Sequence, residues 1–445
     1  MIRERKRARA RARVHWFFFG HGPVHELIYR SFARGLVEFG YMAPRAVMYF
    51  LLTVVGVACV PYSPQVSSTH FVKDPSEISV YGLIYSRPTD DVAILSPLLE
   101  QSEASGGSCF DSKGETLFVA NAQGIAMSVQ LQSGKVKWRY QHVDPFTMPP
   151  VFLPKEAVFG SKADVVVFGS QNGELLAFDA ATGARVWEYD LGGELRESPI
   201  LARHRLIVAN SRNQVLALDP VSGKFLWQHS HETPAKMTIL GHSGVLFANG
   251  KIFVGFSDGL VTALEVEDGS VKWSRPLTLS AATFGDTDTT PALFGDKIFV
   301  ASFSDGLFAL EAATGNVSWQ RPVDSVTRLL VHKSFLYMAN HKELDAVDAQ
   351  SGRMVWRFNY PSAMVTRPVV YGGYVVFGAR PGGLYVLDVA SGRLIQRFHP
   401  GGIVGELTFY KGLLAFLSEG SNVYALKYGA KTGALLAAEH RFEGL

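Results

Sequence analysis

Two stretches of this chain decide its fold. Residues 251–273 read KIFVGFSDGLVTALEVEDGSVKW, and residues 297–319 read KIFVASFSDGLFALEAATGNVSW. In both, short runs of Val, Ile, Phe and Leu are separated by turns that contain Gly, Asn or Asp, which is the pattern of β-strands. No segment of ten or more residues in this region holds a clean helical period. The stretches therefore predict short strands joined by tight turns.

The same unit recurs along most of the chain. Aligned on its turn glycine, the copies are spaced by 49, 40, 46, 46, 37 and 40 residues. A period near 40–45 residues is typical of a propeller blade or of a two-helix solenoid repeat, and the strand pattern favours the blade. The turn glycines are Gly134, Gly183, Gly223, Gly269, Gly315, Gly352 and Gly392.

Two further positions of the repeat are fixed. An acid stands four residues before the glycine in most copies, as Asp179 does before Gly183, where its carboxylate can accept hydrogen bonds from turn amides. A tryptophan stands four residues after the glycine in six copies, and Gln396 replaces it in the seventh. We expect these rings to be buried between neighbouring blades rather than to form a stacking platform for sugars or bases. The repeat tryptophans are Trp138, Trp187, Trp227, Trp273, Trp319 and Trp356.

Counting the strand before each turn gives seven blades. Residues 422–427, NVYALK, share the Tyr-Ala-Leu core of the repeat and add an eighth. Residues 80–86, VYGLIYS, are the strand that we expect to pair with this last blade, so that the ring closes without an open sheet edge. The prediction is an all-β, eight-bladed β-propeller of four-stranded antiparallel blades over residues 80–430, followed by a C-terminal tail over residues 431–445.

The N-terminal segment has the features of a targeting signal. Residues 3–13 read RERKRARARAR, and residues 46–60 read AVMYFLLTVVGVACV, an apolar run too short for a comfortable transmembrane helix. Small residues precede Cys59, as in a bacterial lipoprotein signal, although Gly56 stands where leucine is usual. An uncleaved membrane anchor and a buried helix are the alternative interpretations of the apolar run.

We therefore predict three N-terminal features. Residues 1–58 form a basic leader and lipoprotein signal, with Met42 as an alternative start, and Cys59 is lipidated. Residues 59–79, rich in Pro and Ser, form a flexible tether between the lipid and the propeller. This order predicts a protein tethered to a membrane in an extracytoplasmic space.

The charge distribution disfavours nucleic acid as a partner. The formal net charge is +3, but residues 1–58 carry 10 Lys/Arg against 3 Asp/Glu, whereas the rest carries 33 against 37. The body of the protein is thus mildly acidic. Two cysteines, Cys59 and Cys109, exclude a disulfide-dense scaffold and a four-cysteine zinc or iron–sulfur site within the chain, and leave at most one disulfide.

The repeat resembles the PQQ-type β-propeller repeat over residues 107–427. Two functional classes use that repeat, the quinoprotein dehydrogenases and the non-catalytic scaffolds of the BamB family. Residues 237–273 and 285–323, the second containing GDTDTTPALFGDKIFV, are similar to consecutive blades of the BamB family. This resemblance implies a lipid-anchored protein on the periplasmic face of the outer membrane, without enzymatic activity or cofactor. Its implied partners are BamA, other members of the β-barrel assembly machinery and unfolded outer-membrane proteins.

The resemblance also implies a binding site. The BamB family holds BamA with two neighbouring loops. An Asp-x-Asp-Thr-Thr-Pro segment maps onto Asp286 and Asp288, and a Leu-x-Leu-Arg segment maps onto Met237, Ile239 and Leu240. The acids match, the aliphatic residues are replaced by similar ones, and the arginine is replaced by Leu240. The alternative is that Met237 and Ile239 begin a blade strand and point into the core.

Two other functions compete with the scaffold. A quinoprotein dehydrogenase normally carries a pair of adjacent cysteines and a calcium site, and this chain has no adjacent cysteines. A membrane-tethered sensor or ligand-binding propeller is the other alternative. His229-Ser230-His231-Glu232 offers two metal ligands on one strand face without an identifiable third, so we expect a polar inter-strand loop there and no metal site.

Overall fold

The computed structural model describes residues 71–72, 81–88, 106–195, 197–231, 243–277, 287, 289–302, 305–323, 325–360, 364–380, 383–399, 404–418 and 422–429. The chain divides into two units, Met1–Gln65 and Val66–Leu445. The first unit, with Cys59 and the apolar run, lies outside the described residues, as does the C-terminal tail. Every feature below belongs to the second unit. Its described residues include no helix long and apolar enough to cross a membrane.

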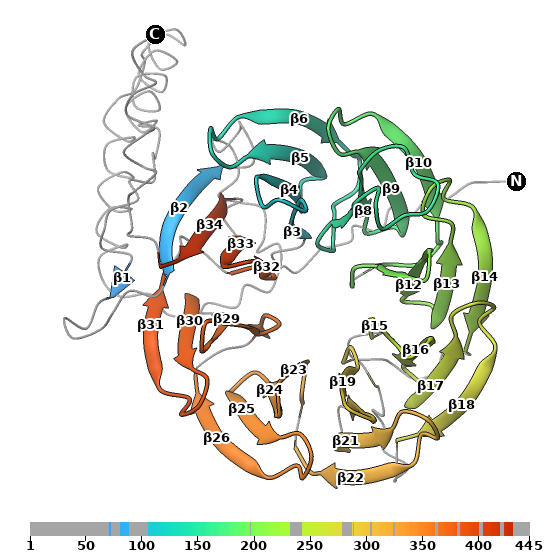
Figure 1. The fold of residues 1–445 in the computed structure, drawn as a ribbon, viewed down its shortest axis with the longest axis vertical. Helices are drawn as coiled ribbons and strands as arrows, with labels where there is room; N and C mark the ends of the chain where they lie inside the picture. Colours follow the sequence, from blue (N-terminus) through green and yellow to red (C-terminus); the bar gives the residue numbers. More distant parts are fainter. Residues whose placement is uncertain are drawn as a thin grey trace, which may run out of the picture. The chain divides into compact units, whose positions relative to one another are not determined.

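The second unit is a ring of eight antiparallel sheets, which confirms the predicted propeller (Figure 1). Each blade runs from a short strand near the axis to a long strand at the rim. From the axis outward, blade 1 consists of β3 (Gly106–Phe110), β4 (Thr116–Asn121), β5 (Ile125–Gln130) and β6 (Val136–Gln141), and blade 2 of β7 (Val151–Leu153), β8 (Val165–Gly169), β9 (Glu174–Asp179) and β10 (Arg185–Asp190). Blade 3 consists of β11 (Ile200–Ala202), β12 (Arg205–Asn210), β13 (Gln214–Leu218) and β14 (Phe225–Ser230), and blade 4 of β15 (Val245–Ala248), β16 (Lys251–Gly255), β17 (Leu260–Glu265) and β18 (Val271–Pro276).

Blades 5 to 7 continue the pattern. Blade 5 consists of β19 (Ala292–Phe294), β20 (Lys297–Ser302), β21 (Gly306–Glu311) and β22 (Val317–Arg321), and blade 6 of β23 (Arg328–His332), β24 (Phe335–Ala339), β25 (Glu343–Asp348) and β26 (Met354–Asn359). Blade 7 consists of β28 (Val369–Tyr371), β29 (Tyr374–Arg380), β30 (Gly383–Asp388) and β31 (Leu394–Phe398). The sheet of blade 7 has two further strands that the repeat does not predict. They are β27 (Met364–Val365), paired with β29, and β1 (Phe71–Val72), paired with the rim strand β31.

Blade 8 closes the ring as the sequence predicts. It consists of β32 (Thr408–Tyr410), β33 (Leu413–Leu417), β34 (Asn422–Tyr428) and the N-terminal strand β2 (Tyr81–Pro88). β2 pairs with β34 over its whole length, from Tyr81 opposite Tyr428 to Pro88 opposite Asn422. Pairing the first part of the propeller with the last joins the two ends of the ring and covers an otherwise open edge.

The turn between the third and fourth strands of blade 2 has the chemistry that the sequence predicts. In blade 2, Asp179 Oδ1 accepts hydrogen bonds from the Thr182 amide and hydroxyl, both at 2.8 Å. Gly183 has a φ of 73°, in the left-handed region that favours glycine. A bulge follows, and it brings Trp187 directly opposite Ala177 across the strand pair.

The repeat tryptophans join neighbouring blades. The ring of Trp227 in blade 3 lies over Gly269 of blade 4, and its indole N–H donates to the Val266 carbonyl at 3.0 Å. Trp138, Trp187, Trp273 and Trp356 donate in the same way to the next blade. Trp319 also lies over the next turn glycine, Gly352, but its indole nitrogen has no partner. Four of these rings, Trp138, Trp187, Trp227 and Trp356, are buried against the next blade as expected, whereas Trp273 and Trp319 are only partly buried.

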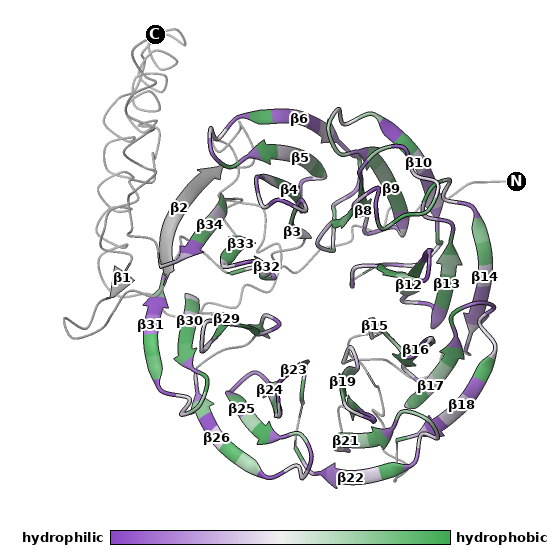
Figure 2. Cartoon of the chain, viewed as in Figure 1, coloured by the Kyte–Doolittle hydropathy of each residue, from purple (hydrophilic) through white to green (hydrophobic). Residues whose placement is uncertain are grey.

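The core consists of eight clusters, one at each seam between blades. At the blade 2–3 seam, Val167 and Leu175 pack against Leu206 and Val208. The second and third strands are buried on both faces and read as continuous apolar runs, whereas rim strands alternate (Figure 2). A core distributed in this way makes every blade depend on its two neighbours.

Candidate partner-binding face

The first strand of each blade lies nearest the axis of the ring (Figure 1). The described residues at the start of these strands, and just before them, meet around that axis. They line a cavity of about 250 Å³. Its walls come from six blades, and the lining residues are Pro149, Glu197, Ser198, Pro199, Ile200, Gly244, Val245, Thr290, Arg367, Glu406, Leu407 and Thr408.

A charged pair bridges this cavity. Arg367 Nη2, at the start of blade 7, donates to Glu197 Oε2 of blade 3 at 2.9 Å and to Thr290 Oγ1 of blade 5 at 3.0 Å. Blades 3 and 7 lie on opposite sides of the ring (Figure 1). One guanidinium therefore connects three blades that share no seam.

A second pair extends the network. Arg328 of blade 6 donates to Glu406 Oε1 of blade 8 through Nε at 3.1 Å and Nη2 at 2.8 Å. The other carboxylate oxygen of Glu406 accepts the backbone N–H of Arg367 at 3.0 Å. The network thus pairs two cations with two anions, and all four side chains keep part of their surface exposed.

The network shifts the pKa values of Glu406 and Arg328. Burial opposes ionisation of Glu406, but Arg328 and Arg367 outweigh it and hold the pKa of this carboxyl below its ordinary value. Burial likewise opposes protonation of Arg328, and Glu406 and Glu197 overcome it and raise the pKa of the guanidinium. Glu406 and Arg328 are therefore charged at neutral pH.

The predicted partner-binding residues, Met237, Ile239, Leu240, Asp286 and Asp288, lie outside the described residues. The structure does describe the residues that follow their two segments, and these lie side by side where β15 and β19 begin. A methyl group on Gly244 would lie 2.4 Å from Thr290 Oγ1, so the Thr290 side chain lies close against the backbone of Gly244. Both Gly244 and Thr290 line the axial cavity.

Hydroxyl groups anchor the ends of these connections, which the sequence reasoning missed. Ser243 Oγ accepts the N–H of Gly255 at 3.0 Å, and Thr289 Oγ1 accepts the N–H of Ala301 at 2.9 Å. Thr366 Oγ1 accepts the N–H of Gly378 in blade 7 at 2.8 Å. The signal was present, because Ser243, Thr289 and Thr366 each stand 26 residues before their turn glycine.

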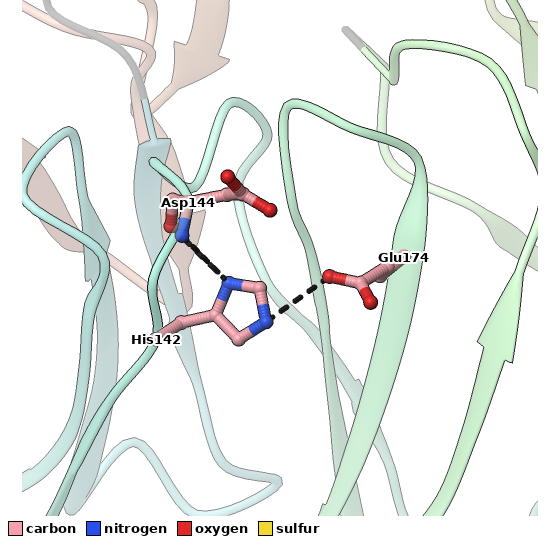
Figure 3. Close-up of side chains that lie close together, drawn as sticks. All are labelled: His142, Asp144 and Glu174. Atoms are coloured by element: carbon pink, nitrogen blue, oxygen red, sulfur yellow. Dashed lines mark hydrogen bonds and ion pairs between the residues drawn. The ribbon is translucent and has the colours of Figure 1, made fainter.

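One group of side chains in the described part of the chain could offer three ligand atoms to a metal ion. The atoms belong to His142, Asp144 and Glu174 and lie within 4.8 Å of one another (Figure 3). His142 Nδ1 accepts the Asp144 N–H at 3.1 Å, and Nε2 lies 3.1 Å from Glu174 Oε2. Both ring nitrogens thus have protein partners, and the contact with Glu174 connects blades 1 and 2.

His231 occupies the same repeat position in blade 3. Its Nδ1 lies 3.1 Å from Asp258 Oδ2 of blade 4, and its ring packs on Phe256. His229 and Ser230 belong to strand β14, so the predicted polar loop begins later than expected. Burial and the neighbouring His231 lower the pKa of His229, whose Nε2 has no hydrogen-bond partner. The recurrence of a histidine–acid contact at one repeat position favours a structural role at the seams.

Cys109 is a free thiol on the first strand of blade 1. Burial raises the pKa of its thiol, so the reactive thiolate is disfavoured at neutral pH. Its potential disulfide partner, Cys59, lies outside the described residues.

Comparison with known proteins agrees with this architecture. A family model described as outer membrane protein assembly factor BamB matches residues 153–358 and 340–436. The outer membrane protein assembly factor BamB of Shewanella oneidensis is 25% identical over 292 residues, covering 63% of this chain and 74% of that protein.

Two solved structures share the fold. The crystal structure of BamB from Moraxella catarrhalis superposes with a TM-score of 0.65 at 21% identity, covering 78% of this chain and 100% of that one. A quinohemoprotein alcohol dehydrogenase from Comamonas testosteroni superposes with a TM-score of 0.57 at 13% identity, covering 79% of this chain and 77% of that one. At these identities the structures establish the propeller alone. The match of the family model, which spans more than half of the sequence, establishes that this chain belongs to the BamB family of outer membrane protein assembly factors.

Proposed function

We propose that this protein is a non-catalytic scaffold of the outer-membrane β-barrel assembly machinery that docks on BamA. The observation that carries the proposal is the family match over residues 153–358 and 340–436, which include both proposed binding segments. The Shewanella relative is an outer membrane protein assembly factor, which supports the same role. Docking would keep the machinery arranged for the folding and insertion of outer-membrane proteins.

The proposed contact uses two chemically different parts. Met237, Ile239 and Leu240 provide an apolar anchor, and Asp286 and Asp288 accept charge-assisted hydrogen bonds from basic groups of BamA. The described ends of both segments support this arrangement, because Gly244 and Thr290 lie against each other at the axial cavity. Two loops leaving neighbouring blades at this point can present one continuous surface.

The enzyme alternative is less well supported. A quinone cofactor at the axis would compete with Arg367 and Glu197, which bridge the cavity at 2.9 Å. The cavity of about 250 Å³ is smaller than the roughly 300–1,000 Å³ typical of small-molecule sites. The chain also lacks the adjacent cysteines of the dehydrogenases.

The proposed location is the periplasmic face of the outer membrane. Cleavage before Cys59 and acylation of its thiol would leave residues 59–79 between the lipid and the closing strand β2, although Phe71–Val72 of this predicted tether pair with β31 as strand β1. Mass spectrometry of the mature N-terminus tests this step. An intact peptide spanning residues 58–60 in the membrane fraction would disprove cleavage.

A pull-down with purified BamA tests the proposed contact. The variant Asp286→Ala/Asp288→Ala should capture less BamA than the unaltered protein while keeping its melting temperature. The variant Met237→Ala/Ile239→Ala should do the same if these side chains form the anchor. Unchanged capture by the acid variant would reject the site, and a collapse in stability of the second variant would place its side chains in the core.

A further inference from the structure

We propose that Arg367 is a positioning residue for partner binding, which acts from the opposite side of the ring by holding the base of the acidic binding segment. The inference rests on the proposed function, because the segment it positions is the one that contains Asp286 and Asp288. Arg367 itself belongs to blade 7, in the connection that leads into β28, and is distant in sequence from both binding segments.

Arg367 contacts Thr290 directly. Thr290 is the second threonine of the acidic Asp-x-Asp-Thr-Thr-Pro segment, and its hydroxyl accepts a hydrogen bond from Arg367 Nη2 at 3.0 Å. The preceding residue, Thr289, is anchored within blade 5, because its Oγ1 accepts the N–H of Ala301 at 2.9 Å. The Arg367 contact therefore adds an anchor on the axis to the one that blade 5 itself supplies.

The two segment ends pack closely. Gly244 follows the apolar segment and leaves no room for a side chain toward Thr290, because a Cβ atom would lie 2.4 Å from Thr290 Oγ1. A shift of Thr290 consequently changes its distance to the start of β15. Holding Thr290 in place thus sets the spacing between the ends of both proposed binding segments.

Arg367 is itself held in place. Its guanidinium is paired with Glu197 at 2.9 Å, and its backbone N–H is bound to Glu406 at 3.0 Å. The Arg367 and Glu197 side chains keep 38% and 22% of their surface exposed, so the pair contributes modestly to overall stability. An arginine that is held both at its backbone N–H and at its guanidinium is nevertheless well suited to orient the group that it contacts, here Thr290.

Arg367 should affect the position of the acidic segment more than the stability of the propeller. The eight apolar seams hold the ring together, so removing one axial contact should leave the propeller folded. The base of the acidic segment, however, should lose one of its anchors. We therefore expect a weaker complex with BamA and a nearly unchanged melting temperature when Arg367 is replaced.

The test measures the dissociation constant of the full chain for detergent-solubilised BamA at 25 °C. Arg367→Met should weaken binding by about tenfold, the scale expected when a supporting contact of an interface is removed. Glu197→Gln, which cuts the same pair from the other side, should weaken it in the same direction. The matched control is Arg185→Met, which breaks the exposed pair Arg185–Glu188 on the rim of blade 2 and should not change the dissociation constant.

A double-mutant cycle distinguishes positioning from a general structural effect. In the Asp286→Ala/Asp288→Ala background, Arg367→Met should have little further effect, because the segment that it positions no longer contributes. An equal loss in both backgrounds would show that Arg367 does not act through the acids and would overturn the inference. Wild-type affinity in Arg367→Met, with the acid variant weakened, would also overturn it while leaving the proposed function intact. Wild-type affinity in the acid variant would instead reject the proposed binding site.

Discussion

Arg367 and Glu197 are 170 positions apart in the sequence and belong to opposite blades, yet their side chains meet at 2.9 Å on the ring axis. The contact closes the middle of the cavity where the first strands of six blades begin. Because Arg367 also binds Thr290, the base of the acidic segment depends on a blade that is not its neighbour. The axis is thus the place where the blades, otherwise joined in series, are connected across the ring.

The stability of the propeller should depend on pH through the ionisation of Glu406. Its pKa in the folded protein lies below the ordinary value of 4.5, so its contribution is fully present above about pH 4.5 and is lost as the pH falls through the folded-state pKa. Glu406→Gln should be less stable than the unaltered protein at pH 7. Thermal unfolding from pH 7 to pH 3 should show this difference shrinking below about pH 4.5. A constant difference would contradict the assignment.

Two equivalent tryptophans should respond differently to the same substitution. Trp227→Phe removes an indole that donates to Val266, and should cost about 1 kcal/mol for the hydrogen bond in addition to the lost ring volume. Trp319→Phe removes an indole without a hydrogen-bond partner, so only the volume is lost. Trp227→Ala should cost about 3–5 kcal/mol. Urea unfolding measures all three, and equal effects of the two phenylalanine variants would contradict the seam geometry.

Gly269 should tolerate alanine much less well than Gly295. Both have a positive φ, 72° and 60°, so alanine is strained at either position. At Gly269 the added methyl would lie 2.5 Å from Trp227 Cε3, whereas at Gly295 nothing lies within 4 Å. The difference in melting temperature between the two variants isolates the packing of the tryptophan on the next blade. Equal melting temperatures would show that the ring moves aside at little cost.

The protein should not bind a pyrroloquinoline quinone cofactor. The cavity is bridged by Arg367 and Glu197, and the sequence has no adjacent cysteines. Isothermal titration of the purified chain with the quinone and calcium should give no saturable heat. Saturable binding at micromolar strength, about −8 kcal/mol, would favour the dehydrogenase alternative.

The blades could be predicted from the sequence because the residues that determine the turns and strands recur from one copy of the repeat to the next. A turn glycine such as Gly269 recurs in seven copies and a seam tryptophan such as Trp227 in six, and the eighth blade followed from NVYALK and the early strand at Tyr81. The extra strand β1 could not be predicted, because it belongs to no repeat position. β27 does occupy a repeat position, since Val365 pairs with Ala379 as Phe146 pairs with Ser170 in blade 2, but a strand of two residues leaves no readable pattern in the sequence.

The axial network was missed for a different reason. Ser198, Thr290 and Arg367 each precede a proline at the start of a first strand, and only Arg367 carries a charge there. That difference was visible in the sequence. The pairing of Arg367 with Glu197 could not be predicted from the sequence, because it depends on the diameter and curvature of a closed ring rather than on spacing along the chain.

The most direct test of the central claim is whether BamA accompanies this protein in its own membrane. The full chain, with a C-terminal affinity tag, would be purified from detergent-solubilised membranes and the bound proteins quantified by mass spectrometry. The proposed function predicts BamA as a major partner of the unaltered chain and its depletion with Asp286→Ala/Asp288→Ala. Recovery of BamA no higher than in a purification from untagged cells would contradict the assembly-scaffold account.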